Sequence, residues 1–266
     1  MTMTLLAILA ATLLAGVGSV WLAALLGFGI LARYTQHMLS LAAGALLATA
    51  FMHLLPEAFE SQVSADQLFP TLLVGLIFFF LLDKAELWHH GHEHHHGHDH
   101  AHVHSHDHAD SQAPAPSGGS WAILTGDSVH CFGDGVLIAS AFVADMRLGV
   151  VAALAVLMHE VPHHMGDLAV LRQASDNRRM ALVKVSLAGG LTALGGVVGF
   201  FLVAQLEAYL PFFLAIASSS FLYVALADLI PQLQKKLSAG ETLAQIVWLA
   251  VGMGMVTLVS GLAHSH

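Results

Sequence analysis

Long runs of apolar residues alternate with short polar connections along the chain. Eight of these runs reach the length of about 20 residues that an α-helix needs to cross the hydrocarbon core of a bilayer. They cover residues 4–30, 37–59, 68–88, 121–143, 147–171, 181–205, 211–233 and 242–262. The pattern therefore predicts an all-α polytopic membrane protein with eight transmembrane helices.

The composition supports this prediction and excludes several function classes. Of the 266 residues, 56% are hydrophobic and 10% are charged, whereas a soluble domain has about 25% charged residues. The net charge of -9 gives no reason to expect nucleic acid as a partner. The sequence has no G-x-x-x-x-G-K-[ST] motif, so a nucleotide is not expected either. The apolar N-terminal run lacks a basic n-region, which favours a retained first span over a signal peptide.

Positively charged residues are distributed unevenly over the connections. Eight of the nine follow spans 1, 3, 5 and 7, namely Arg33, Lys84, Arg172, Arg178, Arg179, Lys184, Lys235 and Lys236, and only Arg147 follows an even-numbered span. Lys and Arg mark the cytoplasmic side of a membrane. We therefore expect both termini outside and the odd-numbered connections in the cytoplasm, in a bacterial inner (plasma) membrane.

One connection is long and rich in histidine. Residues 89–120 follow span 3, and twelve of the 20 histidines of the chain fall within residues 89–108. So polar a segment cannot fold alone, and neutral imidazole is a good ligand for zinc, copper, nickel or iron. We predict a disordered cytoplasmic metal-binding loop, with a passive tether as the alternative. It separates spans 1–3 (residues 1–88) from spans 4–5 (121–172), and spans 6–8 occupy 173–266.

Ionisable side chains gather in spans 4 and 5, in the stretches "GDSVHCFGDG" (126–135) and "MHEVPHHMGD" (158–167). A charge at the bilayer centre costs several kcal/mol unless it has a partner or a cation. The side chains recur four residues apart, so that each pair shares a helix face. The pairs are Asp127–Cys131, His130–Asp134, His159–His163 and Glu160–His164, and Asp167 continues the stripe of His163.

The two spans are joined near Asp145 and should run antiparallel. His130 lies 15 residues before Asp145 and His159 lies 14 residues after it, so both reach a depth on the order of 20 Å at 1.5 Å per residue. We predict that His130, Asp134, His159 and His163 hold one cation. Cys131, Glu160 and the other faces of Asp134 and His163 hold a second. This mixed set of N, O and S ligands favours Zn²⁺, with Fe²⁺, Mn²⁺, Co²⁺ and Cd²⁺ as further candidates.

The stretch "HEVPH" also matches the H-E-x-x-H signature of zinc metalloproteases. In an intramembrane protease, Glu160 would act as the general base on a zinc-bound water. That alternative leaves His130, Cys131, His164 and the histidine-rich loop without a role. It also puts Pro162 inside a helix that must stay regular if both histidines are to face one ion.

At these residues the sequence resembles the ZIP family of zinc and iron transporters. The fifth-helix motif H-E-x-P-H-x-x-G-D of one branch is matched by His159, Glu160, Pro162, His163, Gly166 and Asp167, and the fourth-helix motif H-N-x-x-D-G by His130, Asp134 and Gly135. Cys131 replaces the usual Asn, and His164 replaces a usual Glu. The thiol shifts the second site toward softer metals, and the imidazole lowers the negative charge near it.

The resemblance implies a 3+2+3 arrangement of the spans and uptake of divalent metal into the cytoplasm without enzymatic activity. An exporter of the cation-diffusion type is the alternative within transport, although such exporters usually have six spans. A homodimer is a further expectation. The segments "HLLPEAF" in span 2 and "DLIPQLQ" in span 7 share a Leu-apolar-Pro pattern in opposite orientations, which suggests inverted repeats. His53, Glu57 and Asp228 then become candidate metal waypoints, or polar residues beside a proline kink.

Overall fold

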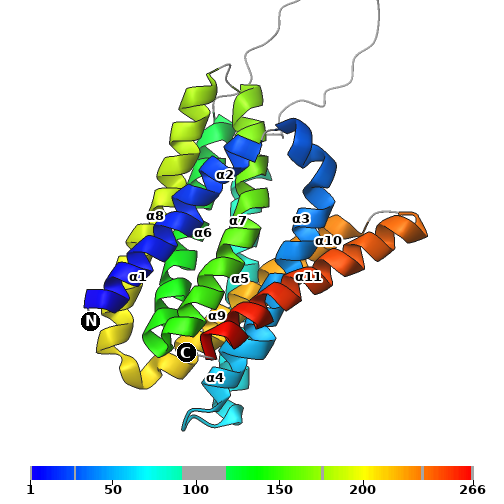
Figure 1. Ribbon diagram of the computed structural model, residues 1–266. Helices are drawn as coiled ribbons and strands as arrows, with labels where there is room; N and C mark the ends of the chain where they lie inside the picture. The colour runs from blue at the N-terminus through cyan, green and yellow to red at the C-terminus, as the bar shows by residue number, and fades with distance from the viewer. Residues whose placement is uncertain (1, 27, 92–117, 175–176, 235–236, 265–266) are drawn as a thin grey trace, which may run out of the picture.

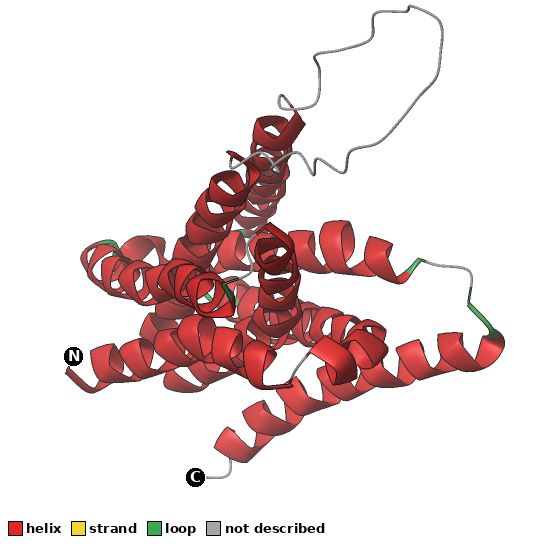
Figure 2. Cartoon of the chain, turned by 90° about the horizontal axis from the view of Figure 1, so that it is seen from above, coloured by secondary structure: helices red, strands yellow, loops and turns green. Residues whose placement is uncertain are grey.

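The computed structural model describes residues 2–26, 28–91, 118–174, 177–234 and 237–264. These residues form helices and short connections, with no strand among them (Figure 2). Eight helical segments within them are long and apolar enough to cross a membrane. The predicted all-α polytopic membrane protein with eight spans is therefore confirmed. Most of the predicted histidine-rich loop lies outside the described residues, because α5 ends at Gly91 and α6 begins at Gly118.

Five spans are single helices and three are composite. Spans 3, 4, 5 and 6 are α5 (Ala65–Gly91), α6 (Gly118–Ala144), α7 (Met146–Ala174) and α8 (Arg178–Gln205). Span 8 is α11 (Ala239–His264). Span 1 joins α1 (Thr2–Leu13), η1 (Leu14–Gly18) and α2 (Ser19–Leu26). Span 2 joins α3 (Phe28–Thr49), η2 (Ala50–Leu54) and α4 (Leu55–Phe59). Span 7 joins η3 (Glu207–Tyr209), α9 (Leu210–Tyr223), η4 (Val224–Leu229) and α10 (Ile230–Leu233).

The composite spans 1, 2 and 7 are interrupted by π turns, namely η1, η2 and η4. A π turn accommodates one extra residue and often marks a functional site. In spans 2 and 7 the π turn directly precedes a short helix with proline near its start, Pro56 and Pro231. The two similar sequence segments therefore adopt the same local form.

The helices form two bundles that lie side by side (Figure 1). One bundle contains α1, α2, α6, α7 and α8, and the other contains α3, α4, α5, α9, α10 and α11. Contacts of α3 with α7 and of α6 with α9 join them. Both termini point toward the end where α6 joins α7, and α7 ends at the opposite end (Figure 1). Any site on α6 and α7 therefore lies within the first bundle or at its border with the second.

Helices α6 and α8 approach each other backbone to backbone. A side chain at Gly135 of α6 would collide with the Thr192 carbonyl oxygen of α8, and one at Gly195 of α8 would collide with the Phe132 carbonyl oxygen of α6. Only glycine lets two helices come this close. The glycine that follows Asp134 in the sequence thus fixes the position of the helix that carries half of the ionisable residues.

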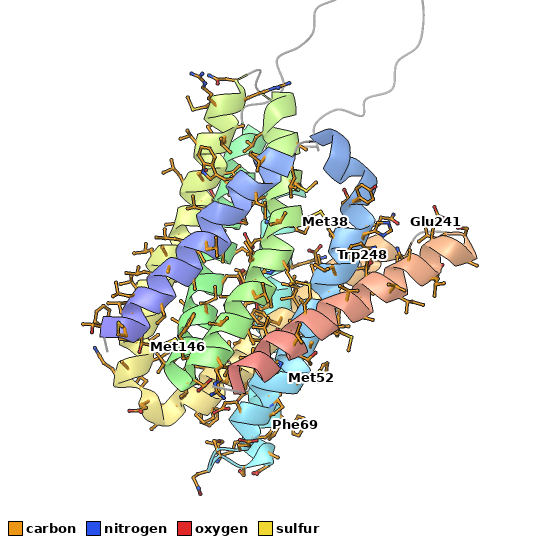
Figure 3. The ribbon with its side chains drawn as sticks, in the orientation of Figure 1. Met38, Met52, Phe69, Met146, Glu241 and Trp248 are labelled. Carbon is orange, nitrogen blue, oxygen red and sulfur yellow. The ribbon has the colours of Figure 1, made fainter. Side chains whose placement is uncertain are left out.

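The outer surface is apolar. Large hydrophobic side chains such as Met52 and Phe69 point outwards (Figure 3), with exposed fractions of 49% and 58%. In span 2, 67% of the most apolar window is buried inside the protein, against 11% in spans 3 and 8. A soluble protein rarely exposes so large an apolar area. Spans 3 and 8 therefore present most of their surface to lipid, and span 2 is central.

Candidate metal centre

The turn between α6 and α7 sets the relative register of the two helices. The Asp145 Oδ1 atom accepts hydrogen bonds from the backbone N–H groups of Arg147 (2.8 Å) and Leu148 (3.2 Å), and so caps the start of α7. The chain reverses within this one residue. As a result the Nε2 atoms of His130 and His159 lie 3.3 Å apart, at one level in the middle of the two helices.

A first group of potential ligands consists of His130, Asp134, His159 and Glu160. The His159 Nε2 atom lies 3.2 Å from Asp134 Oδ2 and 3.2 Å from Glu160 Oε1. The His130 Nε2 atom lies 3.3 Å from the same Glu160 oxygen. The His159 Nδ1 atom faces the Ala155 carbonyl oxygen at 3.4 Å, which directs Nε2 into the group. Two imidazoles and two carboxylates at this spacing suit a tetrahedral zinc ion.

A second group consists of Asp127, Cys131, Glu160 and His164, all of them buried. The His164 Nε2 atom lies 3.0 Å from Glu160 Oε2 and 3.6 Å from Asp127 Oδ1. The Cys131 Sγ atom lies 3.5 Å from Asp127 Oδ1, 3.7 Å from Glu160 Oε2 and 3.8 Å from His164 Nε2. This group combines N, O and S donors. The side chain of His164 is 0% exposed, so the group lies inside the first bundle.

A third group consists of Asp127, His163 and Asp167. The His163 Nδ1 atom lies 3.6 Å from Asp127 Oδ1 and 3.6 Å from Asp167 Oδ2. The His163 side chain is 38% exposed, which makes this the most accessible of the three groups. Water can complete the coordination shell of an ion there, because three protein ligands leave a coordination position open.

Two carboxylates connect the groups into a row. Glu160 turns Oε1 toward the first group and Oε2 toward the second. Asp127 belongs to the second group and the third. Oxygens of Asp127, Asp134, Glu160 and Asp167 and the Nδ1 atom of His163 are buried and make no hydrogen bond of good geometry, although imidazole nitrogens lie as near as 3.2 Å to some of them. Buried polar atoms of this kind are costly unless a cation satisfies them, so the row is suited to hold metal ions.

The grouping differs in detail from the expected one. The sequence places His163 with His130, Asp134 and His159, whereas the structure places Glu160 there and moves His163 to the third group. His163 lies one helical turn beyond His159, about 6 Å along the axis. On the antiparallel α6, the partner one turn away from His130 in that direction is Asp127. Likewise, the second group has Asp127 and His164 instead of Asp134 and His163.

A cavity of about 480 Å³ lies between the two bundles. The first bundle contributes Asp127, His130, His159, His163 and Asp167 to its wall. The second contributes residues of α3, α5, α9, η4 and α10, among them Phe79, Tyr223 and Asp228. All of these lie between mid-span and the ends of the spans that lead to the odd-numbered connections. The cavity therefore joins the first and third groups to one side of the membrane.

The three outlying candidates lie apart from these groups. Asp228 lines the cavity, where its Oδ1 atom accepts a hydrogen bond of 2.8 Å from Gln232 Nε2. His53 lies in η2 and faces the Ser260 hydroxyl of α11 at 3.5 Å, and Glu57 is exposed on α4. None of the three belongs to a metal-ligand group among the described residues. Asp228 is therefore the best placed of them to meet an ion near the groups.

Sequence reasoning missed a residue of span 1 that contacts the row. The Ser19 hydroxyl lies 2.9 Å from His164 Nδ1. A single serine in an apolar span carries no signal in the sequence, because buried serines usually bond to the carbonyl of the preceding helical turn. Only the packing of α2 against α7 brings it to the site.

The geometry also bears on the protease alternative. In the H-E-x-x-H signature, both histidines bind one zinc ion and the glutamate stays off the metal as a base. Here His159 belongs to the first group and His163 to the third, and Glu160 lies between two groups. Among the described residues, the motif therefore places ligands in successive groups along α7 and does not form a single catalytic site.

The fold and the site define a class, that of polytopic α-helical membrane proteins with a candidate metal centre between two spans. Comparison with known proteins makes the assignment specific. The family model described as "ZIP Zinc transporter" matches residues 1–260, and the chain belongs to this family. Its members are transporters and not enzymes, in line with the expectation for this chain.

Several characterised relatives are similar to the chain. It is 31% identical to human zinc transporter ZIP4 over 258 residues, which cover 78% of this chain and 40% of ZIP4. It is 28% identical to zinc transporter ZIP13 of Pongo abelii over 247 residues, which cover 86% of this chain and 68% of ZIP13. The Drosophila melanogaster zinc transporter foi is 33% identical over 142 residues. The chain thus spans less than half the length of ZIP4.

Proposed function

We propose that the protein carries divalent metal ions, zinc first, across a membrane into the cytoplasm. The observation that carries this proposal is the row of three ligand groups linked by Glu160 and Asp127, which leads into the cavity between the bundles. Membership of a zinc transporter family supports it. The mixed N, O and S donors leave Fe²⁺, Mn²⁺, Co²⁺ and Cd²⁺ as further substrates, to be ranked by competition.

The direction of the row follows from the order of residues in α6 and α7. Asp134 and His159 lie nearest the Asp145 turn, and Asp127, His163 and Asp167 lie farthest from it. If the odd-numbered connections are cytoplasmic, as their positive charges suggest, an ion enters from outside at the first group and leaves through the third. In a bacterial inner membrane, the cavity then opens to the cytoplasm.

The second group lies beside this route and not on it. Cys131 and His164 are 0% exposed and do not line the cavity, whereas His130 and His159 do. An ion in the first group can therefore reach the cavity without passing the thiol. We assign transport to the first and third groups and a supporting role to an ion in the second.

Transport needs a change in which side of the membrane reaches the first group. The cavity lies at the border between the bundles, and ligands of all three groups lie on one of them. A shift of the first bundle against the second would move the ion relative to the wall formed by α3, α5 and α9. A homodimer formed through the second bundle would hold that bundle in place during the shift. Sedimentation of the detergent-solubilised protein would detect the dimer.

The proposal is tested by metal flux into liposomes that contain the purified protein and a zinc-sensitive dye. We expect the His130→Ala variant to lose flux by more than about tenfold, because His130 both binds in the first group and borders the cavity. The same change at His37, which stacks on Trp248 between α3 and α11 with ring centroids 5.8 Å apart, should leave flux nearly normal. Normal flux in the His130 variant would refute the site assignment.

The histidine-rich segment offers a separate prediction. We expect replacement of its twelve histidines in residues 89–108 by serine to preserve the initial rate of flux within about twofold, because side chains of α6 and α7 supply the ligands of all three groups. Its effect should instead appear as a changed dependence of flux on cytoplasmic zinc, since imidazoles bind and buffer the ion. Complete loss of flux would mean that the segment is part of the route.

A further inference from the structure

Ser19, a residue of span 1 that contacts the row, lies where the π turn of that span ends. Ser19 follows η1 and begins α2, and it is 0% exposed. A side chain at Gly16, in η1, would collide with the Gly189 carbonyl oxygen of α8. This close approach holds the segment firmly against α8. Ser19 is thus a fixed feature of the wall behind the second group.

The hydrogen bonds of Ser19 have only one consistent arrangement. A serine hydroxyl has one hydrogen to donate and can accept through its lone pairs. Its Oγ atom lies 2.7 Å from the Gly16 carbonyl oxygen, which can only accept, and 2.9 Å from His164 Nδ1. The hydroxyl therefore donates to Gly16, and His164 donates its Nδ1 hydrogen to the hydroxyl.

This arrangement determines which nitrogen of His164 faces the ligands. With the hydrogen of the neutral ring on Nδ1, Nε2 keeps its lone pair. Nε2 is the atom that lies 3.0 Å from Glu160 Oε2 and 3.8 Å from Cys131 Sγ. A hydrogen-bond acceptor behind a metal-binding histidine fixes the ring and increases its basicity.

We propose that Ser19 is a positioning residue for metal binding in the second group. It accepts the Nδ1 hydrogen of His164 and so presents Nε2 to an ion held with Cys131, Glu160 and Asp127. This role presupposes that the second group binds metal, as proposed above. It is specific to an imidazole, because a carboxylate at position 164 has no hydrogen to donate to a hydroxyl that already donates to Gly16.

Cadmium binding to the purified full-length protein tests this role. Cys131 is the only cysteine of the chain, so the ultraviolet thiolate-to-cadmium absorption reports on the second group alone. We expect Ser19→Ala to weaken the affinity measured by this band roughly 10- to 100-fold, the usual cost of losing such a partner. Ser140→Ala removes another buried serine that bonds to the carbonyl of the preceding turn, at 2.9 Å, and should leave the band unchanged.

Two further comparisons separate positioning from packing. Ser19→Thr and Ser19→Val have nearly the same shape, so any steric cost is shared, and only threonine should retain tight cadmium binding. In a His164→Glu background, Ser19→Ala should cause no further loss. Equal cadmium affinity in the Thr and Val variants, or an undiminished loss in the Glu background, would overturn the proposal.

The outcomes also distinguish this inference from the proposed function. Absence of the cadmium band in the unaltered protein would mean that the second group binds no soft metal. A normal band that Ser19→Ala leaves unchanged would remove only the role of Ser19. Nitrogen NMR of histidine-labelled protein gives the same answer without a Ser19 variant: the signal lost in His164→Glu should show hydrogen on Nδ1, and hydrogen on Nε2 alone would contradict the proposal.

Discussion

The Glu160→Gln variant is expected to lose metal transport by more than about 100-fold. The two carboxylate oxygens of Glu160 face different groups: Oε1 faces the first group and Oε2 faces the second. An amide has one oxygen, and its NH₂ group can only donate hydrogen bonds, so at least one group loses a ligand and both lose negative charge. Because loss of a partner behind a ligand already costs 10- to 100-fold, loss of the ligand itself should cost more.

Flux and metal stoichiometry together measure this effect. The variant should bind at least one ion fewer per chain than the unaltered protein, in parallel with its lost flux. Glu207→Gln, an exposed change in η3, serves as the matched control and should behave normally. Retention of near-normal flux and full stoichiometry would show that Glu160 does not bridge two ions. No peptide cleavage is expected in either protein, in contrast to the protease alternative.

The second large effect is expected from Gly135→Val, which should separate α6 from α8. The new side chain would meet backbone atoms, the Thr192 carbonyl oxygen and the Gly196 nitrogen, and backbone cannot rotate away as a side chain does. Overpacking usually costs 1–3 kcal/mol, and we expect about 3 kcal/mol here. Since Cys131 and Asp134 lie on the same stretch of α6, metal binding should fall with stability.

Thermal unfolding in detergent, followed with and without zinc, measures both consequences. Gly133→Val is the control on the same helix, because a side chain at Gly133 would meet no atom within 4 Å. We expect a clearly lowered melting temperature and no stabilisation by zinc for Gly135→Val, and values near those of the unaltered protein for Gly133→Val. Equal melting temperatures for the two variants would mean that α6 and α8 are not in backbone contact.

Hydropathy was sufficient to predict the eight spans, because the length requirement of a bilayer is strict. The depth of the site could also be predicted, since distance from Asp145 fixes height at 1.5 Å per residue. Rotation about the helix axis could not. The sharing of Glu160 between two groups depends on that rotation, and the sequence does not predict it. The predicted depth is also too coarse to separate successive turns, because His163 is expected beside His130 but lies one turn, about 6 Å, farther along the axis.

The π turns lie beyond this kind of prediction as well. Nothing in "LAGVG" signals that η1 holds an extra residue in its turn, and Ser19 reaches His164 only through the resulting packing of span 1 on α7 and α8. In spans 2 and 7 the prolines gave a partial signal, because each removes a backbone donor. The matching local forms are consistent with the predicted inverted repeats, which stay a prediction together with the 3+2+3 arrangement.

A carboxylate that serves two cations divides its electron density between them. A cation is often the strongest local charge in a protein site, and Glu160 exposes each ion to the charge of the other through a single group. Filling the thiol-containing position should therefore loosen the ion beside it. In cells that are rich in soft metal, an ion in the second group would then weaken binding in the first group, and ions would leave the first group faster.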